Sequence, residues 1–200
     1  MFPEITRNDI FRLETERLWL RWPRAADAEA ITRGAGDPDV ALKTATIPYP
    51  YAVEHAEQFI REVRTGNAAG ERLTLVLALK RQPNEVIGAI GAEGAPYRGA
   101  TSYGYWLAKP HWGQGLMTEA SIAFIDLTFA ITSLQEIIAS ALPENIASLR
   151  VQEKIGFVVT GEKLVDRPAR DGPRKVVTTL LKRGAARGVF GPRRAQLAPI

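Results

Sequence analysis

The sequence contains no cysteine, and this absence excludes several kinds of chemistry at once. Disulfide bonds, cysteine-based metal sites and a cysteine nucleophile are all ruled out. Histidine is also rare, because only His55 and His111 occur and they do not show the spacing of metal ligands. Both histidines are expected to have surface or packing roles, and no metal site is predicted.

Long hydrophobic runs are missing too. No stretch approaches the roughly 18 consecutive apolar residues of a membrane span, so no membrane association is predicted. The opening residues, Met-Phe-Pro-Glu-Ile-Thr-Arg, lack the apolar core of a signal peptide, which favours a cytoplasmic location. With 200 residues, 46% of them hydrophobic, the chain is long enough to bury one sizeable core.

Acidic residues become scarce toward the C-terminus. From Lys163 onward there are ten Lys and Arg against two Asp, whereas the whole chain has 26 Lys and Arg against 22 Asp and Glu. We predict a single domain over residues 1–183 and a basic tail over residues 184–200. One interpretation of the basic end is an anionic partner such as RNA. The favoured interpretation is a solvated hairpin and tail, so no nucleic-acid partner is expected.

Against these absences, residues 102–120 stand out. An apolar, aromatic run predicts a strand that contains Tyr103, Tyr105, Trp106 and Leu107. After a short turn, a helical period begins at Leu116. Apolar residues then recur at the spacing of one buried helix face: Leu116, Ala120, Ala123, Phe124, Leu127 and Ile131.

Two glycines, Gly113 and Gly115, lie at the start of this helix, within a segment called here the glycine loop (residues 112–118). Without side chains, the backbone can curl so that successive N–H groups converge on one point. The helix dipole adds about half a positive charge at the same point. The loop is therefore predicted to bind an anion, most simply a pyrophosphate.

Two common phosphate-binding motifs do not fit the glycine loop. The Gly-x-x-x-x-Gly-Lys-Ser/Thr motif needs a lysine, and none follows Gly115. The dinucleotide fingerprint needs a third glycine, where this chain has Thr118. What remains is a loop that offers N–H groups alone, beside a strand edge that can pair with an extended ligand.

The remaining segments alternate between strand and helix patterns. Strands are predicted over residues 17–22, 73–79, 85–91, 136–142, 157–165 and 176–182, and helices over residues 25–32, 53–63 and after Asn145. Gly66 and Gly156 are predicted to end two of the helices, and residues 80–84, with their Pro and Asn, to form a turn. The C-terminal hairpin is predicted to turn at Pro168, Asp171, Gly172 and Pro173. This order predicts a three-layer α/β domain with a mixed sheet.

Three segments, in order, resemble one protein family. Gly-Tyr-Trp-Leu followed by His-Trp-Gly-Gln-Gly-Leu-Met-Thr-Glu-Ala looks like the acetyl-coenzyme A (acetyl-CoA) loop of the GNAT N-acetyltransferases. Residues 13–21 resemble the opening strand of the branch that contains the ribosomal-protein N-terminal alanine and serine acetyltransferases, and residues 145–157 resemble its second cofactor motif. The resemblance covers residues 13–183. It implies the GNAT fold, with α/β/α layers around a mixed, splayed sheet of about six to seven strands.

The resemblance implies acetyl-CoA as the cosubstrate. Its diphosphate would bind N–H groups of the glycine loop, and its pantetheine arm would meet the backbone at Leu107 and Ala108, where an N–H polarises the thioester oxygen. The predicted cofactor-binding residues are Trp106, Leu107, Ala108, Trp112, Gly113, Gln114, Gly115, Leu116, Met117, Thr118, Asn145 and Ser148. Trp112 stands where many members have Gln or Arg, and Met117 where they have Gly or Ala. Glu119 is expected to complement the helix dipole.

By the same resemblance, Ser148 is the candidate that protonates the leaving thiolate. Asn145 is either a helix cap or a cofactor contact. In this family a carboxylate base often stands on the central strand, but this chain has Ser102 or Tyr103 there. Glu93 and Asp166 are the substitute catalytic candidates. Tyr49 and Tyr51, which lie among prolines, either line the acceptor site or pack a loop.

The expected function is direct transfer of the acetyl group of acetyl-CoA to a primary amine. The acceptor is either a protein N-terminal α-amine or a small-molecule amine. An α-amine, with a pKa near 8, needs less help from a base than a lysine side chain near 10.4, and this favours the former. The alternatives are a non-catalytic acyl-CoA-binding sensor and a ribosome- or RNA-associated binding protein. The sequence leaves a homodimer open.

Overall fold

The computed structural model describes residues 2–94, 101–166, 169 and 172–186. In this part of the chain the strands are β1 (Arg12–Glu14), β2 (Leu18–Arg21), β3 (Arg72–Leu79), β4 (Gln82–Gly94), β5 (Thr101–Leu107), β6 (Glu136–Ala141), β7 (Val158–Val165) and β8 (Arg174–Lys182). The α-helices are α1 (Ala28–Ala35), α2 (Pro38–Ala41), α3 (Val53–Ala69), α4 (Leu116–Ile131) and α5 (Ile146–Ile155). Short 3₁₀ turns are η1 (Glu4–Thr6), η2 (Ala25–Asp27), η3 (Lys109–His111) and η4 (Arg183–Ala185).

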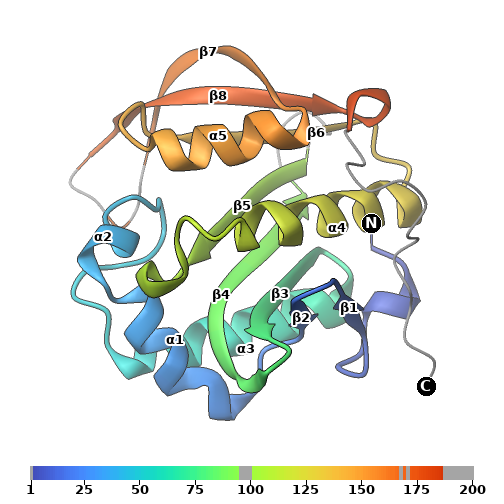
Figure 1. Ribbon diagram of the computed structural model, residues 1–200, viewed down its shortest axis with the longest axis vertical. Coiled ribbons are helices and arrows are strands. Elements are labelled where there is room, and N and C mark those ends of the chain that lie inside the picture. The colour runs from blue at the N-terminus through green and yellow to red at the C-terminus, as the bar shows by residue number, and fades with distance from the viewer. Residues whose placement is uncertain (1, 95–100, 167–168, 170–171, 187–200) are drawn as a thin grey trace.

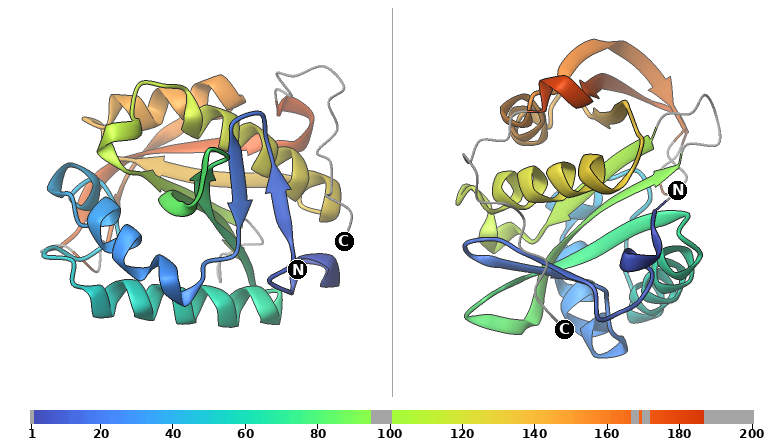
Figure 2. Two further views of the ribbon diagram at one scale, coloured as in Figure 1. Left: turned by 60° about the horizontal axis from the view of Figure 1, so that its bottom comes forward. Right: turned by 90° about the vertical axis from the view of Figure 1, so that its right-hand side faces the viewer.

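The strands form one mixed sheet in the order β1-β2-β3-β4-β5-β6-β8-β7. Neighbouring strands pair antiparallel, except that β5 and β6 pair parallel. Helices cover both faces of the sheet, α1 and α3 on one side and α4 and α5 on the other (Figures 1 and 2). The three-layer α/β/α architecture predicted from the sequence is confirmed.

Alternation of side chains along the strands creates a core on each face of the sheet. On one face, Leu77 and Ile90 pack with Phe124 of α4. On the other, Val76 and Ala89 pack with apolar residues of α1 and α3. Because β3 and β4 are covered on both faces, they are apolar at nearly every position of their central part.

The sheet splays apart after its centre. Strand β5 pairs with β6 only at Thr101 with Ile137 and at Ser102 with Ile138. Beyond Ser102 the two strands separate, and β6 continues its pairing with β8 alone. This opening between β5 and β6 is the splay that the family resemblance implied.

The sheet has one strand more than the upper end of the predicted range, because the opening segment folds back on itself. Thr15 and Leu18 close a tight turn through two hydrogen bonds, Thr15 N–H to Leu18 O and Leu18 N–H to Thr15 Oγ1, each 3.0 Å long. The segment of residues 13–21 therefore makes two strands, β1 and β2, paired antiparallel.

Two of the boundaries predicted from the sequence are wrong. Helix α3 runs through Gly66 to Ala69, and Gly70 caps it in the left-handed conformation (φ 71°). At Gly66 a Cβ atom would lie 2.8 Å from the Arg72 side chain, so this glycine serves close packing. Strand β4 begins at Gln82, so residues 83 and 84 lie within the strand. Gly156 ends α5 as predicted (φ 110°).

At the C-terminal end, η4 follows β8 directly, and Ala186 packs against the core of the α4 face. Of the predicted tail, residues 187–200 lie outside the described residues, as do Pro168 and Asp171 of the predicted hairpin loop. Within the described ranges, no helix combines the length and apolar character needed to cross a membrane.

Candidate active site

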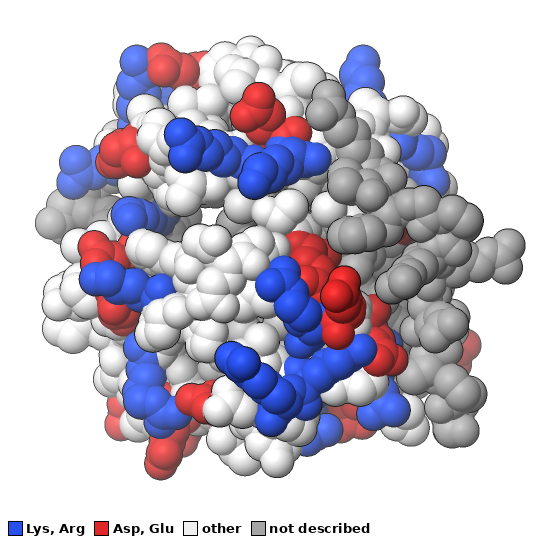
Figure 3. Space-filling view, viewed as in Figure 1, with Lys and Arg blue, Asp and Glu red and all other residues white. Residues whose placement is uncertain are grey.

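A cavity of about 860 Å³ lies where the sheet splays. Its walls come from the segment between α1 and α3, strands β4 and β5, the glycine loop and helix α5. The surface is hollowed between α4 and α5, and Lys and Arg side chains gather over α5 beside the hollow (Figure 3). The cavity therefore brings together the segments that the sequence had singled out from distant parts of the chain.

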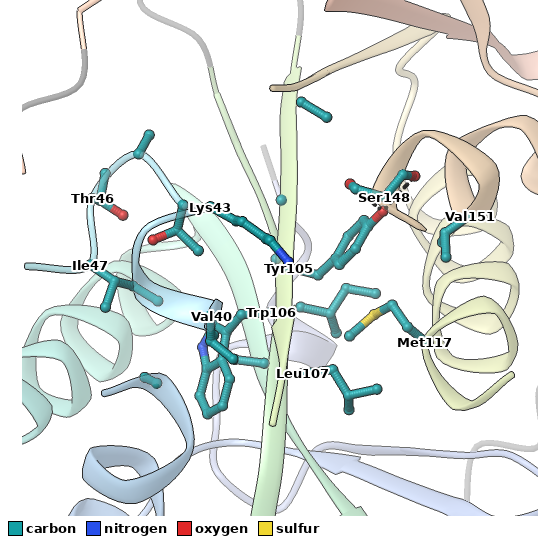
Figure 4. A pocket seen from close by; sticks show the side chains of 18 of the residues that line it. Val40, Lys43, Thr46, Ile47, Tyr105, Trp106, Leu107, Met117, Ser148 and Val151 are labelled. Atoms are coloured by element: carbon teal, nitrogen blue, oxygen red, sulfur yellow. Dashed lines mark hydrogen bonds between the residues drawn. The ribbon is translucent and has the colours of Figure 1, made fainter. Parts of the chain in front are cut away.

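Strand β5 divides the cavity wall into two sides. Tyr105 and Leu107 point toward α4 and α5, whereas Trp106 points the other way, beside Val40 and Ile47 (Figure 4). We call these the α4 side (Tyr105, Leu107, Met117, Ser148 and Val151) and the α3 side (Val40, Ile47, Tyr51, Phe59 and Trp106). Strict alternation along β5 produces the division.

The backbone of the glycine loop has the geometry expected of an anion site. Gly113 and Gly115 are left-handed, with φ of 74° and 75°. The N–H groups of the six consecutive residues 113–118 donate no hydrogen bond to any residue that the structure describes. Five of the six residues, all except Gln114, line the cavity. These unpaired amides stand at the N-terminus of α4, where the helix dipole favours an anion.

Trp112 has a different role from the rest of the loop. Its N–H is used within the protein, by Lys109 O at 3.1 Å. Its indole Nε1 donates to Leu107 O at 2.6 Å, which ties the loop to the end of β5. Lys43, which follows α2, lies over the indole ring with its Nζ 4.7 Å from the ring centroid. Trp112 thus holds the loop through its side chain and offers no free amide.

The end of β5 offers one backbone N–H to the cavity. The Ala108 N–H bonds Ile87 O of β4 at 2.8 Å, so of the two predicted backbone positions, Leu107 and Ala108, the second is already engaged within the protein. Hydrogen-bonded residues alternate in an antiparallel pair, and Leu107 stands opposite Gly88 in the position that does not bond β4. The Leu107 N–H therefore points away from β4, into the opening between β5 and β6.

Two hydroxyl groups meet on the α4 side. Tyr105 Oη lies 2.9 Å from Ser148 Oγ and 3.1 Å from Ser148 O (Figure 4). Burial raises the pKa of Tyr105 to about 12, although hydrogen bonds with Ser148 and Gln152 oppose that rise. The phenol is therefore protonated at neutral pH and can donate a proton. Sequence reasoning missed Tyr105 as a site residue, although alternation along the strand placed it on the same face as Leu107.

Asn145 caps helix α5, which confirms one of its two predicted roles. Its Oδ1 accepts the Ser148 N–H at 3.3 Å. Asn145 also lines the cavity. The cap orients the first turn of α5, and with it the Ser148 hydroxyl that meets Tyr105.

The two predicted carboxylates have different surroundings. Glu93 lines the cavity, but it lies within β4 rather than in a loop, and its Oε2 pairs with Arg72 at 3.0 Å. Asp166 is exposed just after β7 and does not line the cavity. Neither arrangement is that of a base poised for catalysis, because the Glu93 carboxylate is engaged by Arg72 and Asp166 lies outside the cavity.

A further carboxylate, missed in the sequence, lies on the α3 side. Glu62 lines the cavity, and its charge adds to burial in raising the pKa of Tyr51 to about 12. The third lining carboxylate, Asp39, is paired with Lys109 at 2.5 Å. Among the described residues Glu62 has no cationic partner. The sequence feature that could have indicated Glu62 is its helical spacing from His55 and Phe59, which places all three on one face of α3.

The structure brings together most of the predicted residues. Those lining the cavity are Trp106, Leu107, Trp112, Gly113, Gly115, Leu116, Met117, Thr118, Asn145, Ser148 and Glu93, whereas Ala108, Gln114 and Asp166 do not. Trp106 belongs to the α3 side, not to the side of the glycine loop. Tyr51 lines the cavity and Tyr49 does not. His55 accepts the Ala52 N–H at 2.9 Å, capping α3.

Basic residues of α5 complete the rim on the α4 side. Arg150 and Lys154 are one helical turn apart, line the cavity and form no ion pair with a described residue. Together with the unpaired amides they give this side a positive potential. The arrangement fits a ligand that carries several phosphate charges and an extended arm able to pair with a strand edge.

A splayed α/β/α sheet with such a loop beside an unpaired strand edge defines the class of acyl transferases that use a phosphate-bearing thioester. Comparison with known proteins agrees: residues 17–158 match the family model "Acetyltransferase (GNAT) domain". The chain belongs to this family and is an acetyl-CoA-dependent N-acetyltransferase. The family match favours an enzyme over the two alternatives left open by the sequence, a sensor and an RNA-associated protein.

Individual relatives point the same way. The chain is 30% identical over 150 residues to p20 of Bacillus licheniformis, described as an uncharacterized N-acetyltransferase, covering 74% of this chain and 83% of the relative. Among solved structures, the fold resembles RimJ of Mycobacterium smegmatis in complex with CoA-disulfide (TM-score 0.70, 24% identity, 86% of each chain). It also resembles the ribosomal-protein-S5-alanine acetyltransferase of Vibrio fischeri (TM-score 0.71, 21% identity, 86% of this chain and 96% of that one).

Proposed function

We propose that this protein transfers the acetyl group of acetyl-CoA directly to a primary amine while both are bound. The observation that carries the proposal is the row of six unpaired amides at the start of α4, next to the unpaired edge of β5. The amides suit the diphosphate of acetyl-CoA, and the strand edge suits its pantetheine arm, which contains amide groups. Arg150 and Lys154 add positive charge on the same side.

Polarisation and proton donation fall to residues of the α4 side. The Leu107 N–H would hydrogen-bond the thioester oxygen, where negative charge develops during attack by the amine. The Tyr105 hydroxyl, kept neutral by its raised pKa, would protonate the departing thiolate. Ser148 shares a hydrogen bond with Tyr105 and so completes a donor pair. This assignment gives Ser148 a supporting role beside Tyr105.

The amine would approach from the α3 side. The wall there is apolar and aromatic, and Glu62 is its carboxylate without a cationic partner among the described residues. Glu62 would attract the ammonium form of the acceptor and accept its proton, directly or through water. Because one exposed carboxylate gives modest help, an α-amine, with its lower pKa, is the favoured acceptor over a lysine side chain.

Thiol release and acetyl-CoA binding together test the proposal. Matched peptides would be assayed, one with a free N-terminus and no lysine, the other N-terminally blocked and containing lysine, alongside a panel of small amines. We expect acetyl-CoA to bind with a dissociation constant below about 1 mM, and free thiol to form with the first peptide. Binding without thiol release from any amine would indicate a sensor. No binding at all would end the proposal.

A further inference from the structure

The turn between β1 and β2 is fastened to the first turn of helix α4 by one carboxylate. Glu119 Oε1 accepts hydrogen bonds from Thr15 Oγ1 at 2.6 Å and from Arg17 N–H at 2.8 Å. Its Oε2 accepts from Arg17 Nε at 2.7 Å. Residues more than 100 positions apart in the sequence are thereby held at the base of the glycine loop.

This carboxylate is charged and largely shielded. Burial alone would raise the pKa of Glu119, but hydrogen bonds from Thr15 and Arg17 and the charge of Arg17 bring it below its usual value. The Glu119 side chain is 10% exposed and that of Arg17 is 45% exposed. A charged acceptor bonded by a guanidinium and a backbone N–H fixes the direction of the Arg17 side chain.

The fixed guanidinium then reaches the glycine loop. Arg17 Nη1 donates to Gln114 O at 3.0 Å. The Gln114–Gly115 peptide bond is trans, and in a trans peptide the C=O and the following N–H point in opposite directions. By drawing the Gln114 carbonyl toward itself, Arg17 turns the Gly115 N–H away from itself. Gly115 lines the cavity and Gln114 does not, which agrees with a Gly115 N–H directed at the cavity.

The loop needs such a restraint because a glycine lies on one side of this peptide. Rotation of the Gln114–Gly115 peptide changes ψ of Gln114 and φ of Gly115, and Gly115 tolerates left- and right-handed backbone conformations alike, so the peptide can rotate at low cost. A rotated peptide would present a carbonyl oxygen, in place of an N–H, to the bound phosphate. The Gln114 side chain adds a second restraint within the loop, through Nε2 to Pro110 O at 3.0 Å.

We propose that Arg17 is a positioning residue for the cofactor site: it locks the Gln114–Gly115 peptide so that the Gly115 N–H faces the diphosphate, and Glu119 holds Arg17 in place. The inference rests on the proposed acetyl-CoA site and gives the β1–β2 turn a role in positioning that site. Arg17 acts through the loop, since it does not line the cavity itself.

Binding measured with and without the diphosphate tests this role. Isothermal titration of wild type and Arg17→Gln would use acetyl-CoA and S-acetylpantetheine, which carries the same thioester arm but no phosphate. We expect Arg17→Gln to weaken acetyl-CoA binding about 10- to 100-fold. The charged diphosphate then loses the hydrogen bond from the Gly115 N–H, or faces a carbonyl oxygen in its place. Binding of S-acetylpantetheine should not change.

Further variants keep the test independent of folding. Arg17→Lys cannot bond Glu119 and Gln114 through one planar fork, so an intermediate loss of acetyl-CoA affinity is expected. Glu119→Gln keeps the acceptor oxygen but loses the charge, and should give a smaller loss in the same direction. Arg12→Gln is the matched control, because Arg12 lies on the same hairpin and stacks on Trp19 without contacting the loop.

Two results would overturn the inference. One is unchanged acetyl-CoA affinity in folded Arg17→Gln or Arg17→Lys. The other is an equal loss for S-acetylpantetheine, which would show that Arg17 acts on the whole fold and not on the peptide that faces the phosphates. Failure of the wild-type protein to bind acetyl-CoA is a separate outcome, because it would contradict the proposed function itself.

Discussion

The two sides of strand β5 present different kinds of binding group. On the α4 side the binding groups are mostly backbone amides, those of residues 113–118 and of Leu107. On the α3 side they are side chains, such as Tyr51, Trp106 and Glu62, which come from α3, β5 and the segment before α3. A backbone site binds a feature that every reaction of the family shares. A side-chain site can change with the acceptor while the fold and the cofactor site stay the same.

The difference also separates what can be predicted from local sequence. Two glycines followed by a helical period specify a curled loop at a helix start, and residues 112–118 behave accordingly. Side chains on the α3 side meet only because α3 packs over the sheet. Glu62 is 31 residues from Glu93, and nothing local in the sequence places both of them in one cavity.

The largest expected effect concerns the glycine loop. Gly115→Val should weaken acetyl-CoA binding by about 100-fold or more, because a β-branched residue resists φ of 75° and several charge-assisted hydrogen bonds are lost together. Titration calorimetry measures the affinity. Gly161→Val is the control, since Gly161 also has positive φ (145°) but lies in β7, outside the cavity. An equal loss in the control would assign the effect to general strain.

Next in size is the loss of the proton donor. Tyr105→Phe should lower the turnover rate at saturating substrates by up to about 100-fold, while acetyl-CoA affinity stays the same. Ser148→Ala should have a smaller effect, because the phenol remains. The double variant should be about as slow as Tyr105→Phe alone, because the two hydroxyls act as one hydrogen-bonded unit. Strictly additive losses would contradict a shared role.

Changes on the α3 side should be weaker and specific to the acceptor. Glu62→Gln should raise the Michaelis constant for the amine about 2- to 5-fold, since Glu62 is exposed and an exposed charge contributes little. The constant for acetyl-CoA should not change. Glu57→Gln, on the same helix but outside the cavity and beside Arg61, is the matched control. Equal effects of both variants would remove Glu62 from the site.

The pH profile gives the smallest effect. The pKa of Tyr105 is raised from 10.0 to about 12, so its neutral form is favoured in the folded protein. This contribution to stability is complete below pH 10.0 and is lost as the pH rises toward about 12. Turnover should therefore rise as the amine deprotonates and show no alkaline decline between about pH 8 and pH 10. A decline in that range that Tyr105→Phe abolishes would contradict the assignment.

Much of the fold followed from sequence pattern, and the exceptions have physical reasons. The strand, loop and helix around the glycine loop were predicted because their periods change sharply at Leu116. The turn at Thr15 was missed because a threonine side chain closes it, without the glycine or proline that usually marks a turn. A glycine near the end of a helical pattern predicts a helix end, but Gly66 is needed for close packing against Arg72. That contact depends on tertiary structure, so the local sequence does not reveal it.

Within the site, sequence pattern indicates contacts between residues of one segment and gives little sign of contacts between two segments that meet only in the fold. Asn145 caps α5 as its spacing to Ser148 suggested, because both belong to the same turn. Tyr105 was missed, since its partner is 43 residues away on α5. The sequence left open whether Leu107 or Ala108 offers the free N–H, because the alternation of hydrogen bonds between β4 and β5 is set by a register that the sequence does not reveal.

The most direct test of the central claim is an amide-resolved NMR titration of the wild-type protein with acetyl-CoA. If the unpaired amides bind the diphosphate, the backbone N–H resonances of residues 113–118 should shift strongly downfield on binding, and S-acetylpantetheine should leave them nearly unchanged. If acetyl-CoA binds while these resonances stay where they are and others move, the diphosphate is bound elsewhere and the account of the site is wrong.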